Sequence, residues 1–144
     1  DRLNGLCRME VREAEDGDEI VQGRILLAPG GFQLKVYRAG NSCHVRVFSG
    51  DLVNGHCPSV SVMMSSVAEV YGRNAVGVML TGMGGDGADG MKLMHDAGAR
   101  TLAQDEATCI VFGMPKVAWE KGGVDRLVPL PKIADEVIKL VDGE

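Results

Sequence analysis

Aromatic residues, basic residues and long hydrophobic runs are all scarce in this sequence. Aromatic side chains make up 4% of the 144 residues, and the net charge is -5 at pH 7. Nucleic-acid binding is therefore disfavoured, because it needs a basic surface and rings that stack on bases. No apolar run approaches the roughly 18 residues of a membrane-spanning helix, and no secretory signal opens the chain. We expect a cytoplasmic protein that does not insert into a membrane.

Cysteine is also scarce, and its spacing is irregular. The sequence has no C-x-x-C pair; its four cysteines are Cys7, Cys43, Cys57 and Cys109. Free thiols are expected in a chain without an export signal. Two Cys-His pairs, at 43–44 and 56–57, bring four metal-competent side chains close together in sequence. Neighbouring residues on a strand point to opposite faces, however, so we expect neither a metal site nor another cofactor.

The pattern of hydrophobic residues predicts one α/β domain. Before residue 50, short apolar segments predict strands at 7–14, 24–28, 32–37 and 43–48, and the last two alternate at period two like a β-hairpin. From residue 59 onward helices and strands alternate. The predicted helices are 60–71, with Ser59 as N-cap, 88–97, 114–121 and 132–141, and the predicted strands are 75–80, 100–104 and 126–129. This order is typical of a doubly wound, mainly parallel sheet, here with an added antiparallel β-hairpin.

The most informative segment is VGVMLTGMGGDGADGM at 76–91, a predicted strand, a glycine-rich loop and a helix start. Residues 82–87 satisfy G-x-G-x-x-G, and Asp105 follows about 18 positions later, as in dinucleotide-binding proteins. A nucleotide-binding module is therefore one hypothesis. The carboxylate of Asp86 argues against this hypothesis, because it lies where the negatively charged pyrophosphate would bind. Two like charges ~4 Å apart repel by about 1 kcal/mol in water and about 4 kcal/mol at intermediate dielectric. Asp86 could also be the N-cap of the helix that follows, worth about 1 kcal/mol.

Four segments carry further information on function: APGG at 28–31, NGHCPSV at 54–60, LTGMGGDGADGM at 80–91 and AQDEATCIVFGMPKVAWEKGGVDRLVPL at 103–130. Together they resemble one known family, the chemotaxis protein-glutamate methylesterases of the CheB family. The resemblance implies a doubly wound α/β fold with a hairpin. It also implies hydrolysis of glutamate methyl esters on methylated chemoreceptors, and some members deamidate receptor glutamines. The family uses a Ser-His-Asp triad.

The same resemblance assigns roles within the glycine-rich loop. Asp86 matches the triad aspartate, which would hold a histidine in the correct tautomer, and the backbone N–H of Met83 matches a donor of the oxyanion hole. The other residues of the site loop are Thr81, Gly82, Gly84, Gly85 and Gly87.

No serine or histidine of the sequence matches the rest of the triad. The serines are Ser42, Ser49, Ser59, Ser61, Ser65 and Ser66, and none stands in a G-x-S-x-G elbow. The family's serine and histidine lie upstream of the region that residues 1–144 match, and its receiver domain lies further upstream. The resemblance therefore implies a partial catalytic domain that lacks these parts and the N-terminal strands, and we expect it to be inactive alone. A catalytically dead interaction domain remains a third hypothesis.

Three positions within or directly after the segment at 54–60 are also of interest. Ser61 stands where the family commonly has aspartate, and Cys57 stands where it commonly has a basic residue. His56 lies in the shared 54–60 segment but does not match the triad histidine, so we expect it to be structural or to border the site.

Overall fold

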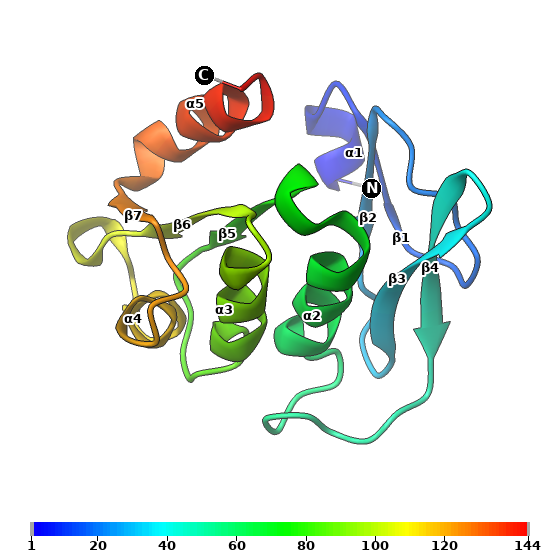
Figure 1. Cartoon of the computed structure of the whole chain (residues 1–144), viewed down its shortest axis with the longest axis horizontal. Coiled ribbons are helices and arrows are strands. Elements are labelled where there is room, and N and C mark those ends of the chain that lie inside the picture. Colours follow the sequence, from blue (N-terminus) through cyan, green and yellow to red (C-terminus); the bar gives the residue numbers. More distant parts are fainter. Residues whose placement is uncertain (1, 144) are drawn as a thin grey trace.

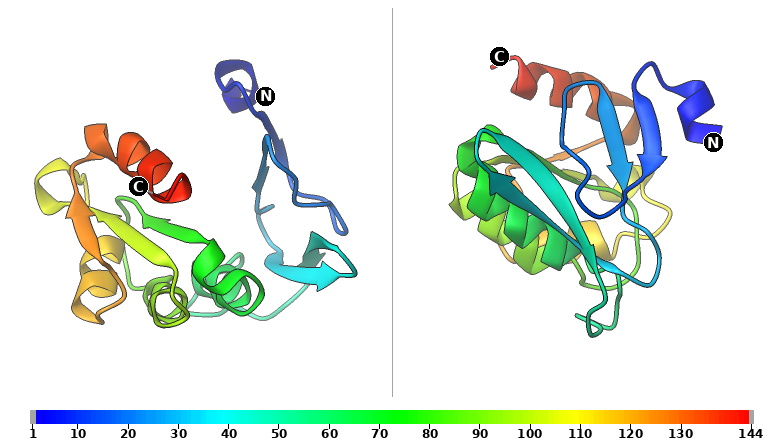
Figure 2. Two further views of the ribbon diagram at one scale, coloured as in Figure 1. Left: turned by 45° about the horizontal axis from the view of Figure 1, so that its top comes forward. Right: turned by 90° about the vertical axis from the view of Figure 1, so that its right-hand side faces the viewer.

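The structure is a computed structural model that describes residues 2–143 (Figure 1). Its largest sheet contains three parallel strands in the order β5-β6-β7. These strands are β5 (Val76–Met79), β6 (Arg100–Gln104) and β7 (Arg126–Val128). Three helices lie on one side of this sheet, α2 (Val60–Tyr71), α3 (Ala88–Asp96) and α4 (Met114–Glu120). A fourth, α5 (Leu130–Val141), covers the other side (Figure 2, left).

The alternation of side chains along β6 explains why helices cover both faces. Leu102 packs with Val128 and with Ile133 of α5, whereas its neighbour Ala103 belongs to the core beneath α3 and α4. Successive residues of a strand point to opposite faces, so a central strand in a parallel sheet is apolar on both. This arrangement confirms the doubly wound α/β fold.

The β-hairpin is also confirmed. Strand β3 (Gln33–Ala39) pairs antiparallel with β4 (Ser42–Phe48), and the turn between them contains Gly40 at φ 63°. Helix α2 packs between this hairpin and α3, and the amide of Val36 in β3 donates to Ser66 Oγ of α2 at 2.9 Å. The views of Figure 2 place the hairpin beside α2 and away from the three-stranded sheet.

The N-terminal region differs from the prediction. The strand expected at 7–14 is confined to β1 (Glu10–Glu13), and a short helix, α1 (Arg2–Leu6), precedes it. Strand β1 pairs in parallel with β2 (Arg24–Leu27), so the region before residue 50 is not only an antiparallel hairpin. Period-two alternation shows which face of a strand is apolar and carries no information on the direction of its partner. All the other predicted elements lie within two residues of the observed ones.

Two 3₁₀ turns complete the described chain, η1 (Gly72–Asn74) after α2 and η2 (Glu106–Thr108) after β6. Ser59 is the N-cap of α2, as predicted, and its Oγ accepts from Val62 N at 3.4 Å. Among residues 2–143 no helix is long and apolar enough to cross a membrane.

Candidate active site

Two loops meet where β5 and β6 end, at the carboxyl edge of the parallel sheet. The loop after β5 contains Thr81, whose N–H donates to Gln104 Oε1 at 2.8 Å and whose Oγ1 accepts from Val111 N at 2.9 Å. Gly82 and Phe112 form a parallel β-bridge between the loops. Ligands of α/β proteins bind at this edge, where loops lie beyond the strand ends. The sheet thus holds the glycine-rich loop in a fixed position.

Asp86 is the central polar group of the glycine-rich loop, and it is 4% exposed. Its Oδ1 accepts a hydrogen bond from Ser59 Oγ at 2.7 Å and one from Asn54 Nδ2 at 3.1 Å. The amide of Ser61 approaches the same oxygen at 3.5 Å, and the amide of Val60 donates to Oδ2 at 2.7 Å. Asp86 therefore binds the N-terminus of α2, where free amides and the helix dipole favour a carboxylate.

The hypothesis that Asp86 caps the helix after it is wrong. The N-cap of α3 is Gly87, at φ 93°, and no side chain caps α3 from that position. A Cβ on Gly87 would lie 2.6 Å from Met79 Cε and 3.0 Å from Val60 Cγ1. The left-handed glycine turns the chain so that the Asp86 carboxylate faces α2 instead of α3.

The hydrogen bonds of Asp86 control its ionisation. Burial raises the pKa of this carboxyl, but the hydrogen bonds from Ser59, Asn54 and the amides of Val60 and Ser61 lower it by more. The net result is a pKa below the ordinary value of 3.8, because each donor stabilises the charged form. Asp86 is therefore an anion at neutral pH.

This shift predicts how stability depends on pH. Because the folded state lowers the pKa of Asp86, its stabilising effect is complete above about pH 4 and is lost as the pH falls through the lower folded value. Asp86→Asn should therefore flatten the dependence of the free energy of unfolding on pH below about pH 4. Urea unfolding between pH 2.5 and 7 measures this, and equal slopes for both proteins would contradict it.

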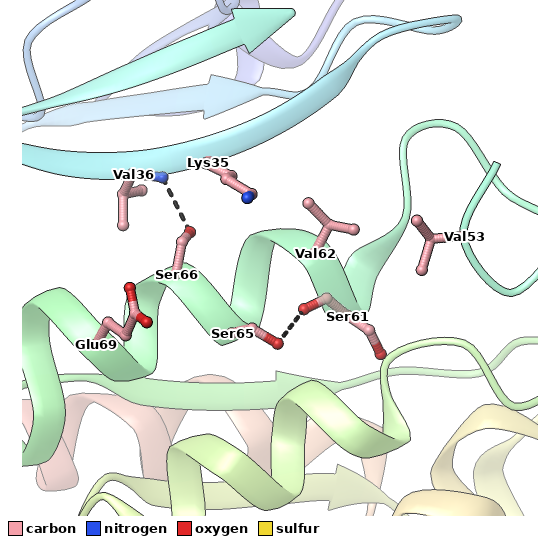
Figure 3. A pocket seen from close by; sticks show the side chains of 8 residues that line it. All are labelled: Lys35, Val36, Val53, Ser61, Val62, Ser65, Ser66 and Glu69. Carbon is pink, nitrogen blue, oxygen red and sulfur yellow. Dashed lines mark hydrogen bonds between the residues drawn. The ribbon is translucent and has the colours of Figure 1, made fainter. Parts of the chain in front are cut away.

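Ser61 holds the first turn of α3 against α2. Its Oγ accepts from Gly87 N at 2.9 Å and from Gly90 N at 3.4 Å, and Figure 3 shows it at the start of α2 beside a cavity of about 340 Å³. Ser61 thus supplies an acceptor for these amides without placing a second negative charge beside Asp86.

The same contacts weaken the nucleotide hypothesis. A pyrophosphate would need the amides at the start of α3, and Ser61 already accepts from two of them. Asp105, which would contact the ribose, instead caps η2 and accepts from Thr108 N at 3.1 Å. Two glycines of the motif serve close packing: a Cβ on Gly82 would lie 2.6 Å from Met114 Sδ, and one on Gly87 would lie 2.6 Å from Met79 Cε. The G-x-G-x-x-G spacing here reflects contacts between protein segments.

Free backbone donors occur next to Asp86. Met83 is 78% exposed, and no acceptor among residues 2–143 binds the N–H groups of Met83, Gly84 or Gly85. Three consecutive amides without partners can stabilise a developing oxyanion. These three residues belong to the same turn as Asp86, but they are exposed whereas Asp86 is buried.

The described serines and histidines do not complete a triad around Asp86. Ser59 touches the carboxylate but is 1% exposed and serves as the cap of α2. His44 contacts Ser42 Oγ and Gly17 O, and His95 contacts Asp125, so both bind elsewhere.

The segment before α2 contributes residues that the sequence reasoning missed. Asn54 donates to Asp86, and the buried amide of Gln33 donates to the carbonyls of Asp51 at 2.9 Å and His56 at 3.2 Å. The side chain of His56 is exposed, and Cys57 Sγ donates to Gly50 O at 3.7 Å. The Asn-Gly pair at 54–55, a strong turn signal, could have indicated a tight turn here but not its contact with Asp86.

Comparison with known proteins decides the family. The CheB methylesterase family model matches residues 1–137. The chain belongs to the CheB methylesterase family. It is 60% identical over 141 residues to a protein-glutamate methylesterase/protein-glutamine glutaminase of Syntrophotalea carbinolica, covering 98% of this chain and 40% of that protein. It is 55% identical to a protein of the same description in Geobacter metallireducens, and the match covers 96% of this chain and 39% of that protein.

A solved structure agrees with this membership. The CheB methylesterase catalytic domain of Thermotoga maritima superposes with a TM-score of 0.94 at 36% identity, covering 97% of this chain and 74% of that one. The CheB resemblance seen in the sequence is therefore confirmed, together with its fold. The chain spans about 40% of the length of the curated relatives and about three quarters of the solved domain.

Proposed function

We propose that residues 1–144 are the aspartate-bearing part of a protein-glutamate methylesterase catalytic domain. The observation that carries this proposal is the buried, ionised Asp86. Three donors bind its Oδ1 and one binds its Oδ2, so Oδ2 retains a lone pair for one more donor. A histidine N–H is the donor that an aspartate of a Ser-His-Asp triad binds.

In this proposal the serine and the histidine come from residues outside 1–144. Support comes from the absence of either group in position among residues 2–143, and from the quarter of the Thermotoga maritima domain that this chain does not cover. The term "complete domain" means residues 1–144 joined to the segment of the same protein that corresponds to this uncovered quarter. Residues 1–144 alone should be inactive, because a carboxylate and amides without a nucleophile cannot open an ester.

The chemistry follows from the positions of these groups. The histidine removes the serine proton as the serine oxygen attacks the ester carbonyl, and Asp86 stabilises the imidazolium that forms. The N–H of Met83 would donate to the oxyanion, with the rest of the 81–87 loop holding its backbone in place. The histidine then protonates the departing methoxide, which leaves as methanol, and water releases the glutamate from the serine. The same steps on a glutamine side chain would release ammonia.

The biological setting is part of the same proposal. The substrates would be methylated chemoreceptors, with a receiver domain controlling access and the cytoplasm as the location. The names of the Syntrophotalea and Geobacter relatives, which include both an esterase and a glutaminase activity, support the two reactions of this proposal.

Methanol release tests the proposal. The complete domain should release methanol from chemoreceptors methylated at glutamate, and it should release none from receptors in which these glutamates are replaced by alanine. Methanol is measured by gas chromatography or by radioactivity from labelled methyl groups. Lack of release by a folded complete domain would count against the methylesterase assignment and leave the interaction-domain hypothesis.

A further inference from the structure

Asn54 occupies a tight turn that places its side chain against the candidate active site. Val53 and His56 exchange two backbone hydrogen bonds of 2.9 Å each, and the two residues between them, Asn54 and Gly55, have φ values of 53° and 78°. Positive φ at both central positions is typical of a type I′ turn, for which Asn-Gly, Asp-Gly and Gly-Gly are all favoured. The turn therefore accounts for a small or short polar residue at position 54, and does not require asparagine.

The turn is anchored rigidly to the site. Gln33 is 2% exposed, and its Nε2 donates to the carbonyls of Asp51 and His56 on either side of the turn. Its Oε1 accepts from Ser59 N at 2.8 Å, at the start of α2. One buried amide thus fixes the turn to the helix that Asp86 caps, so the position of Asn54 Nδ2 relative to the carboxylate is determined by the fold.

The donors to Asp86 come from two directions. Ser59, Val60 and Ser61 all belong to the beginning of α2, whereas Asn54 belongs to a separate segment. The donors from α2 bind both oxygens, Ser59 on Oδ1 and Val60 on Oδ2, and so orient the carboxylate relative to α2. Asn54 ties Oδ1 to a second, separate segment, which further restricts rotation of the carboxylate and leaves the open position on Oδ2.

We propose that Asn54 is a positioning residue that fixes the Asp86 carboxylate so that Oδ2 is the oxygen presented to the triad histidine. This proposal rests on the proposed function. Asn54 would touch neither the substrate nor the reacting atoms, and it would act through Asp86 alone.

Two variants separate this role from a role in the turn. Asn54→Gly keeps a residue suited to positive φ and removes the donor, and Asn54→Asp keeps the turn and places a carboxylate against Asp86. With a short peptide bearing a glutamate methyl ester, Asn54→Gly in the complete domain should lower kcat by about tenfold with KM unchanged. Asn54→Asp should lower kcat further, because two carboxylates then face each other. Asn41→Gly, in the hairpin turn, is the matched control and should leave kcat unchanged.

A second readout needs no activity. In residues 1–144, the ¹³Cγ signal of Asp86 followed by NMR should titrate at higher pH in Asn54→Gly than in wild type and in Asn41→Gly, because the donor favours the charged form. Unchanged kcat and unchanged Asp86 titration in Asn54→Gly would overturn the proposal. An inactive wild-type complete domain would refute the proposed function instead, and the Asp86 titration would still decide whether Asn54 controls the carboxylate.

Discussion

Asp86→Asn is expected to lower kcat of the complete domain by about four orders of magnitude, with a much smaller change in KM. An asparagine cannot stabilise an imidazolium, and its amide favours the wrong tautomer of the neighbouring histidine, which is the effect seen for such substitutions in serine hydrolases. The change should not unfold the protein, since the amide oxygen of asparagine can take the place of Oδ1 and still accept from Ser59. The amide of Val60 loses its acceptor at Oδ2, so some stability is lost. Methanol release under saturating substrate measures kcat directly.

Asp89→Asn is the matched control for that substitution. Asp89 lies three residues further along, in the first turn of α3, and pairs on the surface with Lys121 Nζ at 2.7 Å. Exposed ion pairs contribute little, so this variant should retain activity close to wild type. Equal activities of Asp86→Asn and wild type would return Asp86 to the role of a structural cap for α2.

Gly90→Ala is expected to lower the stability of the fold. Gly90 lies in α3 where it crosses α2, and a Cβ there would be 2.7 Å from Met64 Cβ and 3.0 Å from Ser61 Cα. Backbone cannot move aside as a flexible side chain can, so the two helices must separate. Overpacking of this kind costs about 1–3 kcal/mol, and over most of that range the cost exceeds the gain of about 1 kcal/mol that alanine brings to a helix interior. Urea unfolding of residues 1–144 measures the difference.

Gly5→Ala serves as the control for Gly90→Ala. Gly5 also lies within a helix, α1, but a Cβ there would meet nothing within 4 Å. Helix propensity alone therefore governs this position, and the midpoint of urea unfolding should stay equal or rise slightly. An unchanged or higher midpoint for Gly90→Ala would mean that α2 and α3 are not as closely packed as the structure shows.

The fold was predictable from the sequence wherever side-chain periodicity reflects burial. Helix α2 was placed correctly because Val60, Met64 and Val67 repeat on one face, and β6 because its short apolar segment lies between turn signals. The parallel pairing of β1 with β2 was missed, since alternation does not report strand direction. Helix α1 was missed because five residues are too few for a helical repeat to appear.

The candidate site was predictable only in part. The motif at 80–91 pointed to Asp86 through the family resemblance, but it also matched a dinucleotide fingerprint, because glycines that permit helix packing look the same in sequence as glycines that admit a phosphate. The donors to Asp86 could not be predicted. Asn54 lies 32 positions away and Ser59 lies 27 positions away, and only the docking of α2 onto the loop brings them together.

The central claim is that this chain supplies the aspartate of a triad whose serine lies outside it. A fluorophosphonate probe, which reacts with activated serines, tests this directly when the modified residue is mapped by mass spectrometry. The account predicts that the complete domain is labelled on a serine outside residues 1–144, that Asp86→Asn slows the labelling severely, and that residues 1–144 alone are not labelled. Labelling of any serine within residues 1–144 would contradict it.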